Sequence, residues 1–146
     1  VENKRKHFKS LFENGLKFEL IDGVLDLIEH YHQNGLALIL ASSASMNNIN
    51  MIFEKFDLDK YFKSKISGAD LRASKPHPEI FEKATKLTGF SKEECFVIED
   101  ATNGIIAAKK ADLYCVAFKG INSKNQDYSQ ADKVVTDFKE IYINKL

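Results

Sequence analysis

The chain alternates amphipathic segments with short apolar runs. Between Val24 and Tyr31 the apolar residues recur at helical spacing, and Asn34-Gly35 supplies a left-handed stop, so a helix is predicted there. Leu36 to Ala41 is a continuous apolar run, which is typical of a strand buried on both faces. The same alternation predicts further helices over 47–56, 78–88 and 103–111, strands over 65–67, 95–98, 114–118 and 133–136, and a last short helix. Strands that alternate with helices indicate an α/β fold with a parallel sheet.

The first residues depart from this rhythm. Residues 1–14 have the pattern of a basic amphipathic helix, with Phe8 and Phe12 on one side and lysines and an arginine elsewhere. One interpretation is a solvated surface helix. The other is the last helix of a separate cap whose basic face meets an anionic substrate, which would make Lys4 and Arg5 possible substrate contacts.

Composition narrows the class of protein. With 146 residues, 44% of them hydrophobic and 29% charged, the chain suits one globular domain. Its 21 basic residues balance 21 acidic ones, so no overall charge favours nucleic acid or a membrane surface. No apolar stretch approaches a membrane span or the core of a signal peptide, so we expect a soluble cytoplasmic protein. Cys95 and Cys115 lie in strand-like runs without a metal-binding spacing, which predicts buried packing residues.

Polar residues follow three of the predicted strands. Ser42 and Ser43 follow the first, Lys75 lies in a loop after the second, and Glu99 and Asp100 end the third. The carboxyl ends of parallel strands meet at one edge of a sheet, so these side chains should converge. A hydroxyl and a lysine suit a phosphoryl group, and two carboxylates suit a hard cation. Each has a plainer alternative: a serine that caps a turn, a surface lysine, and acids favoured at a helix N-terminus.

Taken in order, these stretches resemble the haloacid dehalogenase superfamily, in its β-phosphoglucomutase-like and sugar-phosphatase-like branch. The matching stretches are Leu40-Ala-Ser-Ser43, Ala73-Ser-Lys-Pro-His-Pro-Glu-Ile-Phe81, Val97-Ile-Glu-Asp-Ala-Thr-Asn-Gly104, 125–135 and 137–141. The resemblance implies a three-layer Rossmann-like core and a Mg²⁺-dependent phosphatase acting on a small phosphorylated metabolite such as a sugar phosphate. A β-phosphoglucomutase is the alternative activity.

The same resemblance assigns roles to the polar residues. Ser42, Ser43 and Lys75 would bind the phosphate, Ser42 and Lys75 with a part in catalysis, and Glu99 and Asp100 would anchor Mg²⁺. No nucleic acid or membrane partner is expected. Many relatives place a basic or polar residue close after the serine motif, where this chain has Met46.

The nucleophile of the family is missing from the sequence. Relatives use the first aspartate of an Asp-x-Asp-Gly motif at the end of the central strand. Asp22-Gly23 comes closest, but Leu20 stands where the nucleophile should be, and Asp57-Leu-Asp59 has the pattern of a surface turn.

We therefore expect a fragment: residues 1–16 as a remnant helix of a helical cap domain, and 17–146 as a core that lacks its first central strand. A segment outside this sequence would supply the nucleophile, and the open sheet would favour self-association. A catalytically dead binding module is the second hypothesis. A nucleotide-binding or receiver-like domain is disfavoured, because no Gly-x-Gly-x-x-Gly or Walker sequence is present.

Overall fold

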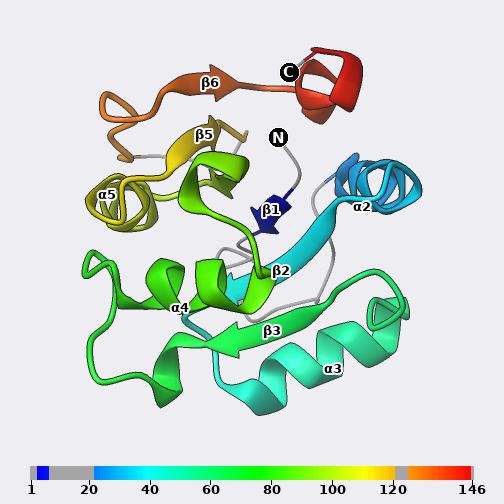
Figure 1. Ribbon diagram of the computed structural model, residues 1–146, viewed down its shortest axis with the longest axis horizontal. Helices are drawn as coiled ribbons and strands as arrows, with labels where there is room; N and C mark the ends of the chain where they lie inside the picture. The colour runs from blue at the N-terminus through cyan, green and yellow to red at the C-terminus, as the bar shows by residue number, and fades with distance from the viewer. Residues whose placement is uncertain (1–2, 7–21, 121–124, 146) are drawn as a thin grey trace.

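A six-stranded parallel sheet organises the protein (Figure 1). The computed structural model describes residues 3–6, 22–120 and 125–145. The strands are β1 (Asn3–Lys6), β2 (Ala37–Ser42), β3 (Ser64–Ser67), β4 (Cys95–Glu99), β5 (Tyr114–Phe118) and β6 (Lys133–Val135). Their order is β3-β2-β1-β4-β5-β6, and every neighbouring pair is parallel. The predicted α/β class is confirmed.

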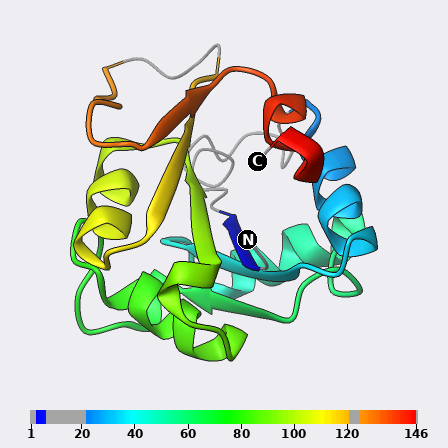
Figure 2. The ribbon, with the colours of Figure 1, turned by 45° about the horizontal axis from the view of Figure 1, so that its top comes forward.

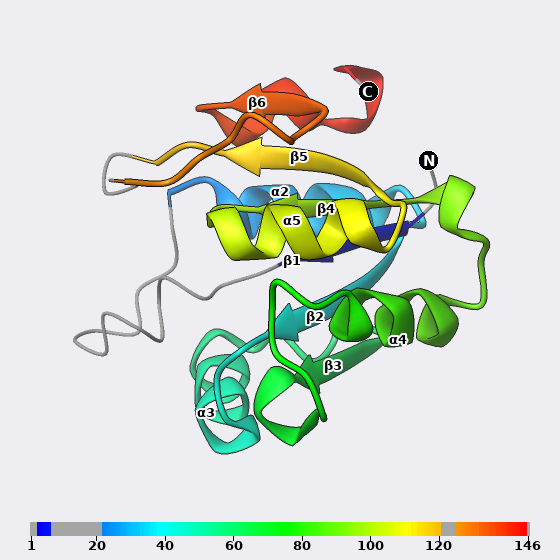
Figure 3. The same ribbon diagram turned by 90° about the vertical axis from the view of Figure 1, so that its left-hand side faces the viewer.

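Helices cover both faces of the sheet, which makes three layers (Figure 3). The helices are α2 (Val24–Gln33), α3 (Met46–Phe56), α4 (Glu79–Thr88) and α5 (Thr102–Lys110). Successive residues of a strand point to opposite faces. Leu38 and Leu40 of β2 therefore pack in one cluster with α2 and α3, whereas Ile39 and Ala41 pack in the other with α4 and α5. This arrangement explains why β2 is apolar throughout.

Local capping fixes where the helices begin and end. The Ser45 hydroxyl accepts a hydrogen bond from the Asn48 N–H at the start of α3. Gly89 ends α4 with φ of 78°, a left-handed conformation that favours glycine. A capping box of Ser91 and Glu94 is present in the short 3₁₀ turn before β4.

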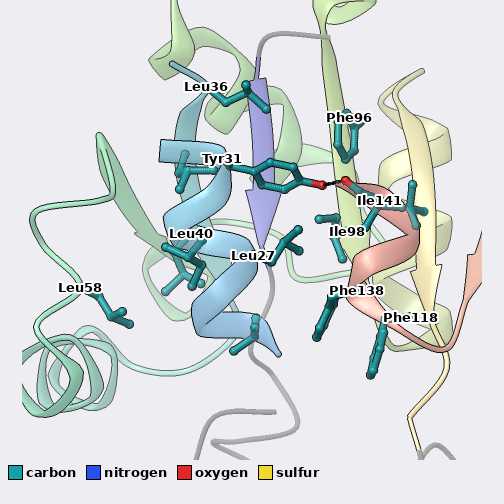
Figure 4. Close-up of a cluster of buried hydrophobic side chains, with 14 of the residues drawn as sticks. Leu27, Tyr31, Leu36, Leu40, Leu58, Phe96, Ile98, Phe118, Phe138 and Ile141 are labelled. Carbon is teal, nitrogen blue, oxygen red and sulfur yellow. Dashed lines mark hydrogen bonds between the residues drawn. The ribbon is translucent and has the colours of Figure 1, made fainter. Parts of the chain in front are cut away.

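The C-terminal segment closes the face of the sheet that carries α2 (Figure 2). It forms 3₁₀ turns at Phe138–Ile141 and Ile143–Lys145, where the sequence predicts a short helix. The buried Tyr31 hydroxyl donates to the Ile141 carbonyl at 2.5 Å, inside the apolar cluster shown in Figure 4. The Ile143 N–H donates to Nε2 of His30 at 2.9 Å. Phe138 and Ile141 of this segment are therefore part of the core.

The N-terminal expectation is wrong where the structure describes it. Asn3–Lys6 form β1, not a helix, and β1 lies between β2 and β4. The central strand expected to be missing is thus provided by this chain. The physical reason is that a ladder joins backbone groups, so β2 and β4 can satisfy their inner N–H and C=O groups with a polar segment.

Three further expectations change with β1 in place. Lys4 and Arg5 lie in the sheet and not on a cap helix. Self-association through an open middle of the sheet loses its premise, since β2 and β4 are both paired there. The rest of the predicted cap remnant, residues 7–16, lies outside the described residues.

Two simpler predictions concern the core. Cys95 and Cys115 are buried free thiols, as the packing interpretation predicts. In the part of the chain that the structure describes, no helix has the length and apolar character needed to cross a membrane.

Candidate active site

The polar ends of the strands meet at the carboxyl edge of the sheet. Ser42, the last residue of β2, pairs in register with Ser67, the last residue of β3. Glu99, the last residue of β4, pairs with Ala117 of β5. All strands are parallel, so these side chains share one edge, as the sequence predicts.

Lys75 joins the ends of the two strands that flank β1. Its Nζ lies 3.0 Å from Oε2 of Glu99, at the end of β4, and 3.5 Å from the carbonyl oxygen of Ala41, near the end of β2. The same nitrogen lies 4.9 Å from the centre of the Phe81 ring. Lys75 is 7% exposed and Glu99 is 1% exposed. The surface-lysine alternative is therefore wrong for Lys75.

The Glu99 carboxylate is held on both of its oxygens. Oε2 accepts from Lys75, and Oε1 accepts from the N–H of Asp100 at 3.2 Å. Burial raises the pKa of Glu99 to about 7, because it penalises the charged form more than Lys75 favours it. Removing one partner of such a buried pair leaves an uncompensated charge, at a cost of about 3–5 kcal/mol. The geometry therefore indicates that Glu99 positions the ammonium group of Lys75.

Gly104 leaves the space in which the Glu99 carboxylate sits. A Cβ atom at Gly104 would lie only 1.9 Å from Cδ of Glu99. Gly104 is buried in the first turns of α5, so the helix backbone itself forms one wall around the carboxylate. The sequence contains this glycine in the stretch that resembles the family, but nothing in the spacing identifies it as a wall of the site.

The loop after β2 is fixed by serine hydroxyls. Ser42 is fully buried, and its Oγ accepts from the Ala44 N–H at 3.1 Å. The Ser67 hydroxyl donates to the Ala44 carbonyl at 2.5 Å. Ser42 therefore does cap the turn, as its plainer alternative has it, and a hydroxyl that accepts one bond can still donate another. Ser43 is half-buried on the same loop, and Met46, the first residue of α3, packs against the core.

Two residues at this edge were not found by sequence reasoning. The Tyr128 hydroxyl donates to the Asp100 carbonyl at 3.1 Å, and Oε1 of Gln126 accepts from the Thr102 N–H at 2.7 Å. Both lie more than 20 residues from their partners. Only the path of the β5–β6 connection brings them to the acid pair.

The donor set at the edge suits magnesium. Asp100 is half-buried in the turn that follows β4, directly after Glu99. Among residues 3–6, 22–120 and 125–145, no group of three or more His, Cys, Asp or Glu side chains is placed to hold a metal ion. This excludes a closed zinc-type cage from the described part of the chain. Mg²⁺ takes one or two carboxylates and completes its shell with water and substrate phosphate, so the acids present fit it.

Comparison with known proteins gives a consistent family. A family model for haloacid dehalogenase-like hydrolases matches residues 1–118. The bifunctional riboflavin kinase/FMN phosphatase of Arabidopsis thaliana is 30% identical over 147 aligned residues, covering 99% of this chain and 39% of that protein. Protein CbbY of Cereibacter sphaeroides is 26% identical, covering 94% of this chain and 61% of that protein.

A solved structure agrees with these sequence matches. The crystal structure of CbbY from Rhodobacter sphaeroides in complex with phosphate superposes with a TM-score of 0.75 at 27% identity, covering 82% of this chain and 54% of that one. The chain therefore belongs to the haloacid dehalogenase-like hydrolase family. It spans only 39% to 61% of the length of the curated relatives named above.

Proposed function

We propose that this member of the family is part of a Mg²⁺-dependent phosphatase that acts on a small phosphorylated metabolite such as a sugar phosphate. The observation that carries the proposal is the buried Lys75–Glu99 pair, which lies between the ends of β2 and β4 and next to Asp100. A buried cation beside a carboxylate at the carboxyl edge of a parallel sheet suits an anionic ligand. The relatives support the proposal, since one is an FMN phosphatase and another was solved with phosphate.

The geometry supports the following roles for the residues at this edge. The ammonium group of Lys75 neutralises charge on the phosphoryl oxygens, and the Glu99 carboxylate keeps that ammonium group at the edge of the sheet. Ser42 and Ser43, on the loop fixed by Ser67, donate hydrogen bonds to the phosphoryl group. Asp100 would hold Mg²⁺, and Glu99 would have the lesser part, because both of its carboxylate oxygens already accept hydrogen bonds. The bound metal supplies charge neutralisation on the transferring group.

The nucleophile is proposed to come from outside these 146 residues. The sequence contains no Asp-x-Asp-Gly, and β1 is followed by His7-Phe8-Lys9, which offers no carboxylate. An aspartate delivered by another segment would have to reach the carboxyl edge of the sheet, since β1 already fills the place between β2 and β4. Its carboxylate oxygen would bond to phosphorus as the ester oxygen leaves, and water would then release phosphate. This chain by itself is therefore expected to be inactive.

The binding partners and the cellular location of the whole protein are also proposals. The balanced charge supports a small phosphorylated substrate and gives no reason to expect nucleic acid or a membrane as partner. We place the enzyme in the cytoplasm. A second candidate activity is that of a β-phosphoglucomutase, which the resemblance of the motifs favours.

The decisive experiment measures phosphate release by the whole protein, with and without Mg²⁺, across a panel of sugar phosphates. Asp100→Asn should raise the Mg²⁺ concentration needed for half-maximal rate, and Lys75→Ala should lower turnover. Conversion of a β-hexose 1-phosphate to the 6-phosphate without phosphate release would replace the phosphatase by the mutase. No turnover, together with retained binding of inorganic phosphate, would favour the dead binding module.

A further inference from the structure

The connection between β5 and β6 returns to the acid pair after leaving the sheet. The hydroxyl of Tyr128, which is half-buried, donates to the backbone carbonyl of Asp100 at 3.1 Å. Tyr128 also packs against the apolar cluster formed by α4 and α5, so its ring is anchored while its hydroxyl reaches the turn. The carbonyl of the proposed metal-binding residue is thus held from a segment 28 residues away.

A second anchor lies two residues further along the turn. Oε1 of Gln126 accepts from both the N–H and the hydroxyl of Thr102, at 2.7 and 3.0 Å. The Thr102 hydroxyl accepts in turn from the Asp127 N–H at 2.7 Å. Thr102 is the first residue of α5, where the backbone N–H has no partner within the helix. Gln126 therefore caps α5 from outside.

The two anchors bracket the turn that carries the Asp100 carboxylate. One fixes the peptide at Asp100 and the other fixes the chain at Thr102, so the short segment between β4 and α5 is held at both ends. Its inner side is fixed as well, because the Asp100 N–H donates to Glu99. Residues that orient a ligand without touching the metal typically change metal affinity about 10- to 100-fold when removed.

We propose that Thr102 and Tyr128 are positioning residues that hold the Asp100 carboxylate where it can bind Mg²⁺. This inference rests on the proposed function, which makes Asp100 the metal ligand. It gives a role to the stretch Asn125–Ser129, which resembles the family but has no part in the phosphate and metal roles assigned above. The role is one of geometry, since neither side chain supplies a carboxylate.

The test measures metal affinity directly in the whole protein, by counting free Mn²⁺ with electron paramagnetic resonance. Thr102→Val keeps the side-chain shape but removes the hydroxyl, and Thr102→Ser keeps the hydroxyl. Tyr128→Phe removes one oxygen atom, and Tyr114→Phe does the same at a half-exposed tyrosine at the start of β5. We expect Thr102→Val and Tyr128→Phe each to weaken Mn²⁺ binding roughly 10-fold, with Thr102→Ser and Tyr114→Phe unchanged.

The outcomes separate this inference from the proposed function. Loss of Mn²⁺ binding in Asp100→Asn, with Thr102→Val and Tyr128→Phe both at the unaltered affinity, would overturn the inference alone. Mn²⁺ binding that survives Asp100→Asn, or is absent from the unaltered protein, would overturn the metal assignment and the inference with it. Equal losses in Thr102→Val and Thr102→Ser would also contradict the positioning role, because the serine retains the hydroxyl.

Discussion

Replacing Gly104 by alanine tests how tightly the Lys75–Glu99 pair is held. The added methyl group would lie 1.9 Å from Cδ and 2.3 Å from Oε2 of Glu99, far inside van der Waals contact. Because Glu99 is fully enclosed and bonded to Lys75, its carboxylate has no room to retreat without leaving that partner. Gly104→Ala should therefore break the buried pair.

The size of the effect follows from two opposing contributions. Alanine is better than glycine inside a helix by about 1 kcal/mol, which by itself would stabilise α5. Breaking a buried pair costs about 3–5 kcal/mol. The net loss should be about 2–4 kcal/mol, which lowers the melting temperature of a chain of this size by roughly 5–15 °C.

The assay is urea unfolding followed by circular dichroism. Asn103→Ala is the matched control, since it lies exposed in the same helix and should leave the unfolding free energy unchanged or slightly raised. In the background Lys75→Met/Glu99→Ala, which removes the pair and opens the space, Gly104→Ala should become stabilising by about 1 kcal/mol. A Gly104→Ala protein as stable as the unaltered one, in the original background, would refute the steric argument.

Three further expectations concern stability, charge and thiol chemistry. Tyr31→Phe removes the buried hydrogen bond to the Ile141 carbonyl and should lower the free energy of unfolding by about 1–3 kcal/mol in a urea titration. An unchanged free energy of unfolding would contradict this expectation. The hydrogen bond from Lys92 lowers the pKa of the Asp112 carboxyl. The ion pair therefore stabilises the fold above the ordinary pKa of an aspartate, and this stabilisation is lost as the pH falls through the lowered pKa. In Lys92→Gln, an NMR titration should show the pKa of Asp112 back in its usual range. Burial raises the pKa of the Cys115 thiol, so iodoacetamide should label it only after unfolding, and rapid native labelling would contradict its burial.

The strands β2 and β4 could be predicted because their side chains alone reveal them. Both are buried along nearly their whole length between two helical layers, so each is a continuous apolar run. The helices could be predicted equally well, since α2, α3 and α4 each bury one row of apolar residues at helical spacing. What the apolar pattern records is burial, and these elements are defined by burial.

β1 could not be predicted from that pattern. Asn3–Lys6 contain no apolar residue, and their place in the sheet is defined by backbone pairing with β2 and β4. Backbone hydrogen bonding leaves no trace in side-chain type. The same residues fit the basic side of a helix, so the periodicity favoured the wrong element.

The convergence of the candidate site was predictable, but its internal bonds were not. That Lys75 and Glu99 share an edge follows from parallel strands. That they pair with each other, with Gly104 against the carboxylate, depends on how α5 packs on β4. The anchors at Gln126 and Tyr128 depend likewise on the path of a connection that has no regular pattern.

The place of β1 has a consequence for the order of folding. Its residues pair with 37–40 on one side and with 95–98 on the other, so both ladders join segments far apart in the chain. During synthesis β1 is made before either partner, and its second partner follows only after some 90 further residues. Contacts of such long sequence separation are slow to form. β1 therefore precedes both of its partners in synthesis and, on this reasoning, is locked into the sheet only after β4 has formed.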